Sequence, residues 1–579
     1  MKKIIKITVL LLVYNLGFGQ TNYYVDKANG SDNNNGSSTA PWKTIQKAAT
    51  KATPNSIVNI KAGTYYENVV INVSGTSGNY ITFKNYANDN VIIDGTNTPG
   101  STLLTVTNKS FLKFENLTIQ NKTVNDAQGV LVQTTGIGSS TDLTFKNITV
   151  TKINWNANKD IPVNPNNNAQ GFIVYGRNGG ITNLTIDECK VFNNILGYSE
   201  ALAVNGNIDG FIVKNCKVYD NTNIGIDILG HEGTASNTSL DEARNGVVIN
   251  NECYNNVAKY ATSAGIYVDG ARNITIERNK SYQNGYGIEV GAERDGIVQQ
   301  ITVKNNLIYK NKEAGLSIGG FDDNTTGQVI NSVIRNNTFL QNDTANKGSG
   351  EISMSKASNC TFENNIFYTG PENLLMFIDN KSPQSNNTFN YNCWYTPNND
   401  QNDIAVDWRG TTYDTFAAYR SATGQDANSL YANPSLVSIS STPPIVKLNA
   451  ASVCINKGKP ITAITSGELD FYGAGRISNT IIDIGASEYS ATLGTTTNEI
   501  LNFGMISPNP SSGIFNFELD ADKKPYFITV YNMGGQELKK YNFLTNRFSI
   551  DLSGLTEGTY FVKMQNKNGV SSKKIIIKK

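Results

Sequence analysis

Four near-copies of one short phrase carry the side chains best suited to chemistry. The copies occupy residues 225–230, 265–270, 287–292 and 315–320. Each contains an apolar–x–apolar strand, and successive side chains of a strand point to opposite faces. The middle position of each strand therefore faces outward, and these positions hold Asp227, Tyr267, Glu289 and Ser317.

The carboxylates of these phrases are suited to acid–base catalysis. If the copies stack as successive coils, Asp227 and Glu289 lie about 10 Å apart at Cβ, with Asp269 roughly 8 Å from each. Carboxylates on one patch repel one another, so at least one pKa should be raised. The protonated group can act as a general acid and its ionised neighbour as a base. A separation of about 6.5–9.5 Å suits an inverting glycosidase.

Further polar and aromatic residues extend this site. His231 is the only histidine of the chain, and it stands beside Glu232 in a long insertion that also holds Arg244. Tyrosine and phenylalanine rings offer faces for sugar rings. The predicted catalytic residues are Asp227, Asp269, Glu289 and His231. The predicted substrate-binding residues are Tyr267, Glu293, Glu232, Tyr286, Phe321 and Arg244.

Two other interpretations of this patch stay open. Outward polar residues of a strand array are commonly just solvated surface. Clustered carboxylates also suit a hard cation, so Asp227, Asp269 and Glu289 could hold Ca²⁺. The cofactor prediction is accordingly either none or Ca²⁺.

A repeat across the chain positions these residues. The residue before each second-strand aromatic turn recurs with a minimum spacing of 27 residues, as from Asn279 to Asn306. A minimum spacing lengthened by inserted loops is typical of a solenoid. The sequence predicts an all-β chain built on a right-handed parallel β-helix of about eleven coils, with aromatic rings stacked in its interior. The eleven ladder positions are Asn85, Asn116, Asn147, Cys189, Cys216, Asn251, Asn279, Asn306, Asn337, Asn365 and Asn392.

Flanking segments divide the chain further. Lys2, Lys3 and Lys6 before a short apolar run predict a signal peptide over residues 1–19. The β-helix is predicted over 20–400, with residues 41–50 as an amphipathic helix that covers its open first coil. Residues 401–489 are predicted to cap the other end, and 490–500 form a Thr-rich linker. Short alternating strands over 501–579 predict a small β-sandwich.

Two stretches resemble known families. Ser507-Pro-Asn-Pro-Ser-Ser-Gly, residues 530–535 and residues 555–563 resemble the type A sorting domain of the Bacteroidetes type IX secretion system. That resemblance implies export across the outer membrane, removal of the domain, and release or surface attachment. Tyr23-Tyr-Val-Asp and residues 30–36, 40–48 and 62–67 are similar to the opening of pectate-lyase-like β-helix proteins, particularly family 9 polysaccharide lyases. Such lyases imply a lysine base and Asp-bound Ca²⁺, but the outward row here contains no lysine.

Bulk composition excludes some partners. Lys and Arg number 49 against 48 Asp and Glu, so no net field favours nucleic acid. Six cysteines in 579 residues do not make a disulfide scaffold, and Cys189 and Cys216 are expected as buried thiols or a disulfide pair. The predicted protein is a monomer that passes through the periplasm and outer membrane and is secreted or held at the cell surface. Its partners are the type IX machinery and a polysaccharide.

The predicted activity is hydrolysis of an extracellular plant or algal polysaccharide by carboxylate acid–base catalysis. The first alternative is a Ca²⁺-assisted lyase that cleaves a uronate-containing glycan by β-elimination, with Tyr267 or His231 as base. The second is a carbohydrate-binding or adhesive β-helix without catalysis.

Overall fold

The chain divides into two compact units at Ser490 and Ala491. The computed structural model describes residues 19–320, 322–459, 467–477, 481–490, 504–519, 526–533, 535–566 and 569–579. The predicted signal peptide falls almost wholly outside these residues, as does most of the predicted linker. Among the described helices, none is long and apolar enough to span a membrane.

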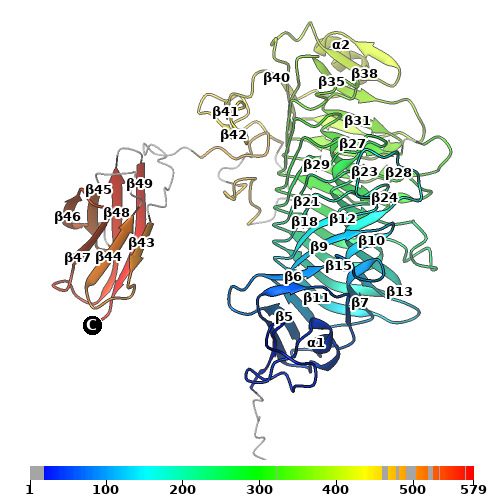
Figure 1. The fold of residues 1–579 in the computed structure, drawn as a ribbon. Coiled ribbons are helices and arrows are strands. Elements are labelled where there is room, and N and C mark those ends of the chain that lie inside the picture. Colours follow the sequence, from blue (N-terminus) through cyan, green and yellow to red (C-terminus); the bar gives the residue numbers. More distant parts are fainter. Residues whose placement is uncertain are drawn as a thin grey trace, which may run out of the picture. The chain divides into compact units, whose positions relative to one another are not determined.

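The first unit is a parallel β-helix, as predicted (Figure 1). A typical coil contains three strands, β20 (Ala264–Asp269), β21 (Arg272–Glu277) and β22 (Lys280–Tyr282), each hydrogen-bonded to its counterpart in the next coil. We call the three resulting surfaces the first, second and third faces. Valine, isoleucine, leucine and phenylalanine side chains fill the interior.

The first and second faces form one 27-stranded sheet, because β13 (Ala169–Asp187) and β15 (Leu202–Lys214) run continuously around the corner between them. The other first-face strands are β4 (Val69–Ile71), β7 (Thr102–Thr107), β10 (Ala127–Gln133), β17 (Ile226–Leu229), β23 (Tyr286–Gly291), β27 (Leu316–Gly319), β31 (Ile352–Ser355), β35 (Leu374–Ile378) and β38 (Ala405–Trp408), which pairs with β39 (Thr411–Tyr413). The other second-face strands are β1 (Thr21–Val25), β2 (Ser56–Ile60), β5 (Ile81–Asn85), β8 (Leu112–Glu115), β11 (Ser140–Lys146), β18 (Ala243–Ile249), β25 (Thr302–Lys304), β29 (Val333–Arg335), β33 (Thr361–Glu363) and β36 (Thr388–Asn390), and β24 (Ile297–Gln299), β28 (Gln328–Ile330) and β32 (Ala357–Ser358) lie at the corner.

The third face is a separate sheet of thirteen strands in the described residues, two more than the eleven coils predicted. The first and last strands escaped the count because no ladder asparagine precedes them. Ile60 pairs with Asn85 before the first strand, and Ser429 takes the ladder position before the last, where its Oγ accepts from the Asn392 N–H at 2.8 Å. The strands are β3 (Gly63–Tyr65), β6 (Val91–Asp94), β9 (Thr118–Thr123), β12 (Thr149–Asn154), β14 (Lys190–Phe192), β16 (Lys217–Tyr219), β19 (Glu252–Tyr254), β22, β26 (Leu307–Tyr309), β30 (Thr338–Leu340), β34 (Ile366–Tyr368), β37 (Cys393–Tyr395) and β40 (Leu430–Tyr431).

The predicted asparagine ladder is confirmed in the coils that hold Asn279, Asn306 and Asn337. Asn279 donates through Nδ2 to Asn306 Oδ1 at 3.0 Å, and Asn306 donates in the same way to Asn337 at 2.9 Å. Each amide also donates to a backbone carbonyl of the preceding coil, such as that of Ile276 from Asn306. A second buried ladder, absent from the sequence prediction, joins Asn194, Asn221, Asn256, Asn284, Asn311 and Asn342.

Removal of one ladder amide should destabilise the fold measurably. In Asn306→Ala the buried N–H of Asn279 and the carbonyl of Ile276 lose their partner. We expect the free energy of unfolding to fall by about 1–3 kcal/mol, measured by chemical denaturation. Asn402→Ala, at an exposed loop position, is the control and should leave it nearly unchanged. An Asn306→Ala variant as stable as the control would contradict a structural role for the ladder.

The aromatic rings predicted for the interior lie on the outside of the third face. In β14 the side chain of Val191 enters the core, so its neighbour Phe192 points outward. The rings stack at centroid distances of 4.6–4.9 Å, because in-register parallel strands place the same position of each coil directly over the last. The stack comprises Phe192, Tyr219, Tyr254, Tyr282 and Tyr309.

A short helix lies at each end of the β-helix (Figure 1). Helix α1 (Ile45–Lys51) begins later than predicted, because Thr44 is its N-cap and accepts a hydrogen bond from the Lys47 N–H. It buries Ile45, Ala48 and Ala49 against the first coils. Helix α2 (Phe416–Thr423) buries Phe416 and Tyr419 in the same core at the far end.

The remainder of the predicted C-terminal cap does not close the end of the β-helix. The described residues of 436–489, here called the strap, include β41 (Leu436–Ser438) and β42 (Ile445–Leu448) and run back along the outside of the third face. Outward positions of β26, β30, β34 and β37 are apolar, and Val446, Leu448, Cys454 and Ile484 pack on them. This apolar surface explains why the segment folds onto the side of the coils.

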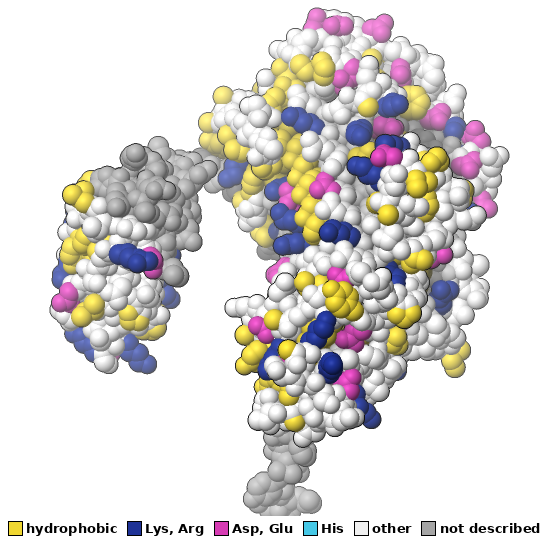
Figure 2. Space-filling model, in the orientation of Figure 1, with side chains coloured by type: hydrophobic (Ala, Val, Ile, Leu, Met, Phe, Trp, Pro, Cys, Tyr) yellow, Lys and Arg dark blue, Asp and Glu magenta, His cyan; other side chains and the backbone are white. Residues whose placement is uncertain are grey.

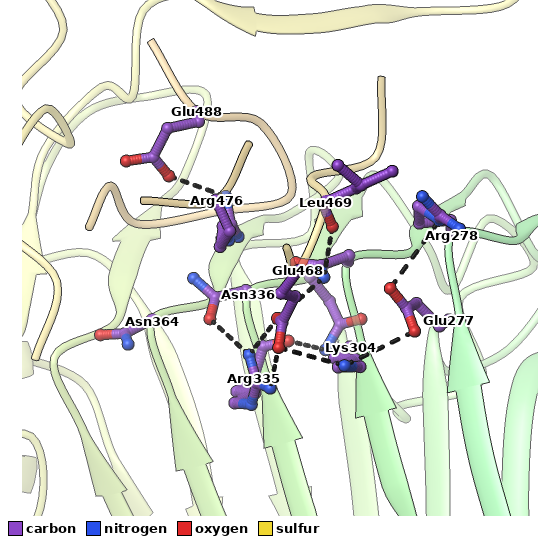
Figure 3. Close-up of polar contacts among 12 residues, drawn as sticks. Glu277, Arg278, Lys304, Arg335, Asn336, Asn364, Glu468, Leu469, Arg476 and Glu488 are labelled. Atoms are coloured by element: carbon purple, nitrogen blue, oxygen red, sulfur yellow. Dashed lines mark hydrogen bonds and ion pairs between the residues drawn. The ribbon is translucent and has the colours of Figure 1, made fainter. Parts of the chain in front are cut away.

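Buried ion pairs also hold the strap (Figure 3). Arg335 donates through both terminal nitrogens to the Glu468 carboxylate, at 2.7 and 2.8 Å, and Lys304 Nζ lies 3.1 Å from the same group. Farther along the strap, the fully buried Arg476 pairs with Glu488 at 3.1 Å.

The second unit contains two antiparallel sheets that share one apolar core, which makes it a β-sandwich. One sheet comprises β43 (Gly504–Ser507), β44 (Ile514–Leu519) and β47 (Arg547–Asp551). The other comprises β45 (Tyr526–Tyr531), β46 (Glu537–Phe543), β48 (Gly558–Asn566) and β49 (Gly569–Ile577).

Candidate functional site

The outward row of the first face lies in direct register. Asp227 pairs with Tyr267, Tyr267 with Glu289, and Glu289 with Ser317. The long insertion that begins at His231 does not disturb this alignment, because it forms no strand between β17 and β18. The row therefore presents one carboxyl group on each side of Tyr267.

Asp269 lies on the next outward position, and it pairs with Gly291, which in turn pairs with Gly319. One oxygen of the buried Asp269 carboxyl accepts the Glu293 N–H at 3.1 Å. This hydrogen bond brings the loop after β23 over the face. An added Cβ at Gly291 would lie 3.0 Å from the Gly319 carbonyl oxygen and 3.1 Å from the Tyr267 hydroxyl, so the glycine lets Tyr267 lie close to the sheet.

Glu200 joins this patch, although the sequence prediction missed it. Burial, followed by repulsion from Glu232 and Glu293, raises the pKa of Glu200 to about 7. The residue precedes β15, whose Ala203 pairs with Asp227, so it lies one coil before the first phrase. Residues 201–206 form an additional, degenerate copy of the phrase. This copy is the sequence signal that could have revealed Glu200. We call Glu200, Asp227, Glu232, Asp269, Glu289 and Glu293 the carboxylate cluster.

The cluster strongly perturbs its own protonation. Burial, with repulsion from Glu200 and Asp269, raises the pKa of Asp227 well above its ordinary value. Burial also raises the pKa of Glu289, with contributions from Glu293 and Asp269, while a 3.2 Å hydrogen bond from Ser317 opposes the rise. Asp227 is 1% exposed, and its Oδ1 has no hydrogen-bond partner among the described residues. Burial and mutual repulsion therefore favour the neutral forms of Asp227 and Glu289.

Tyr267 and Glu293 line a pocket of about 390 Å³, whereas Asp227, Asp269 and His231 do not. Its lining also includes Glu289 and Arg294. Burial and repulsion from Glu232 raise the pKa of Glu293, whereas the charge of Arg294 and a hydrogen bond with Tyr267 lower it. Phe321, predicted to bind substrate, lies outside the described residues.

His231 stands at the side of the cluster, at the start of the long insertion. Its backbone has a φ of 62°, and its N–H donates to the Asp241 carbonyl. The ring packs against Gly296, where any added Cβ would lie 2.5 Å from His231 Cδ2. An ion pair of 3.2 Å between Glu232 and Arg294 joins the same two loops. His231 Nε2 is buried and has no partner among the described residues.

The other two predicted binding residues have different surroundings. Tyr286 begins β23 and is half-buried, and burial followed by repulsion from Glu289 raises its pKa. Arg244 lies on β18 of the second face, where it donates to Asp209 Oδ2 at 3.1 Å and to Asn207 Oδ1 at 3.0 Å. The structure therefore brings Tyr286 beside the cluster and engages Arg244 elsewhere.

The carboxylate cluster is also the predicted site for Ca²⁺. Oxygen donors of the cluster are of the type that Ca²⁺ prefers. In the part of the chain that the structure describes, however, no three His, Cys, Asp or Glu side chains are placed to hold a metal ion. Calcium binding stays an untested prediction, and no step below depends on it.

The first unit is thus a parallel β-helix with an acidic pocket on one face. The chain is 37% identical over 430 residues to the uncharacterized protein YwoF of Bacillus subtilis (strain 168), across 72% of this chain and 89% of that protein. It belongs to the same family.

Residues 505–578 match the secretion system C-terminal sorting domain. The protein is therefore exported by type IX secretion to the cell surface or the extracellular space.

Solved structures with some likeness include the pectate lyase Pel9A, at 17% identity and a TM-score of 0.43, covering 81% of this chain and 96% of that one. Another is the GH136 lacto-N-biosidase from Eubacterium ramulus, at 13% identity and a TM-score of 0.42, covering 71% of this chain and 67% of that one. A rhamnogalacturonan lyase is 15% identical with a TM-score of 0.35, covering 64% of this chain and 84% of that one.

Proposed function

We propose that this protein is an exported glycoside hydrolase that cleaves an extracellular polysaccharide by carboxylate acid–base catalysis. The observation that carries the proposal is the row in which Asp227 and Glu289 flank Tyr267, with a raised pKa at both carboxyls. A surface of solvated carboxylates would not be buried in this way. A β-helix also offers a long open face suited to an extended polymer.

The proposed roles follow from the position of each group. Two strand spacings separate Asp227 from Glu289, roughly 10 Å, which is near the range that leaves room for a water molecule in an inverting enzyme. One of the two, kept protonated, donates to the glycosidic oxygen, and the other, once ionised, activates water on the opposite side of the sugar. Asp269 orients that water, and His231 is proposed to assist from the side wall.

The same charges disfavour elimination as the reaction. A lyase must bind a uronate, whose carboxylate would approach the carboxylate cluster, with Arg294 as the cation that lines the pocket. Like charges at short range oppose such binding. The outward row has no lysine, so Tyr267 or His231 would have to serve as base. Elimination remains the second candidate, and a non-catalytic carbohydrate-binding solenoid is the third.

Product analysis on a panel of neutral and uronate-containing plant and algal polysaccharides tests the proposal. Hydrolysis releases new reducing ends without unsaturated products. Elimination would release reducing ends together with products that absorb in the ultraviolet. Binding to a polysaccharide with neither product, in the full chain and in the Asp227→Asn variant alike, would identify a binding protein instead.

A further inference from the structure

Two cysteines far apart in sequence meet where the strap crosses the last coils. Cys393 begins β37, and because Trp394 points into the core, Cys393 points outward from the third face. Cys454 lies on the strap. Both side chains are completely buried in one apolar cluster, and both are free thiols.

The Cys454 thiol contacts the Cys393 thiol, which donates to the Ala432 carbonyl at 3.3 Å. Their backbones are also held on both sides. The Cys393 N–H donates to the Asn365 carbonyl at 2.8 Å, and the Cys454 carbonyl accepts from the Ile484 N–H at 3.1 Å. Neither cysteine is adjacent to the carboxylate cluster, and neither has a part in the proposed reaction.

The route of export supplies the chemistry that such a pair needs. The protein crosses the periplasm, an oxidising compartment in which disulfides form and persist. We propose that Cys393 and Cys454 form a disulfide that fastens the strap to the outside of the β-helix. Oxidation removes one proton and one electron from each thiol and forms one S–S bond. The electrons pass to a disulfide-bearing oxidant, which is reduced to its dithiol.

The order of events follows from burial. Contact with Cys393, together with burial, raises the pKa of the Cys454 thiol well above its ordinary value, so little thiolate exists once the strap has docked. Thiolate is the species that reacts in thiol–disulfide exchange. The bond therefore forms while the strap is docking, and afterwards it resists reduction until the protein unfolds.

The remaining cysteines make the prediction specific. Cys189 and Cys216 also lie in contact, but they occupy neighbouring ladder positions inside the coils, where each thiol donates to backbone carbonyls. The Cys393 thiol also donates to a backbone carbonyl, so what distinguishes the Cys393–Cys454 pair is that it joins the strap to the coils. Cys360 is buried away from the strap and serves as a control position.

Peptide mapping of the exported, full-length or naturally processed protein under non-reducing conditions tests the proposal. We expect a peptide pair joined through Cys393 and Cys454, with four of the six thiols titrating after denaturation. Cys360→Ser should keep this link, whereas Cys393→Ser should lose it. The oxidised wild type should unfold at a higher denaturant concentration than the reduced wild type, and the midpoint of Cys393→Ser should not respond to reductant. Six free thiols, or a link that excludes Cys454, would overturn the proposal.

Discussion

Turnover should fall by about 10²–10⁴-fold in Asp227→Asn and in Glu289→Gln, because each change removes a titrating proton while it preserves shape. Both side chains lie in register across Tyr267, so either amide leaves the other carboxyl without its partner. Substrate binding and the melting temperature should stay close to those of the wild type. Steady-state kinetics on the polysaccharide identified by product analysis provides the measurement.

Glu188→Gln is the matched control, since Glu188 is an exposed carboxylate that pairs with Lys146 away from the cluster. Its turnover should equal that of the wild type. Activity within a fewfold of wild type in both Asp227→Asn and Glu289→Gln would show that these carboxyl groups have no catalytic role.

Asp269→Asn provides a further check through pH dependence. The charge of Asp269 is one of the causes that raise the pKa of Asp227. Its neutralisation should lower that pKa, so the protonated form is lost at lower pH and the alkaline limb of kcat/KM moves to lower pH. An unshifted profile would show that the two groups do not titrate together.

The second large effect concerns stability. Burial raises the pKa of Glu468, but hydrogen bonds and charge from Arg335 and Lys304 lower this pKa to about 2 (Figure 3). Glu468→Gln leaves Arg335 buried without its counter-charge, and such a loss costs about 3–5 kcal/mol. Chemical denaturation at neutral pH should show this decrease, whereas Glu188→Gln should change the free energy of unfolding by less than about 1 kcal/mol.

The sign of the pH dependence follows from the lowered pKa. A carboxyl whose folded-state pKa lies below its unfolded value stabilises the protein fully above that unfolded value, near 4.5. The contribution is lost as the pH falls from about 4.5 through about 2. Wild-type stability should therefore decline over this range by more than that of Glu468→Gln, and parallel declines would refute the role of the pair.

Charged side chains of both signs share the surface of the β-helix. On the face of the β-helix seen in Figure 2, basic and acidic side chains are interspersed. The charge of the candidate site is thus local, since a nearly neutral chain gathers several carboxylates on one face.

The amino-acid sequence alone determined the repeat and its consequences. Asparagines such as Asn279 and Asn306 recur at the spacing of one coil, and each satisfies buried backbone groups of its neighbours, so the period predicts the fold. The same period predicts that Asp227, Tyr267 and Glu289 stand in one row, because in-register parallel strands stack equivalent positions. The direction of the aromatic stack was predicted wrongly, since strand alternation was not followed from Val191 to Phe192.

Tertiary structure decided what the period does not encode. His231 and Glu232 lie on an insertion and Glu293 lies on the loop after β23. Because loops leave the strand register, the repeat alone does not specify their contacts within the site. The strap joins Glu468 to Arg335 and Cys454 to Cys393 across long stretches of chain, and outward apolar residues of the third face direct that docking. Such contacts depend on which surfaces remain uncovered after the coils form, and only the folded molecule specifies those surfaces.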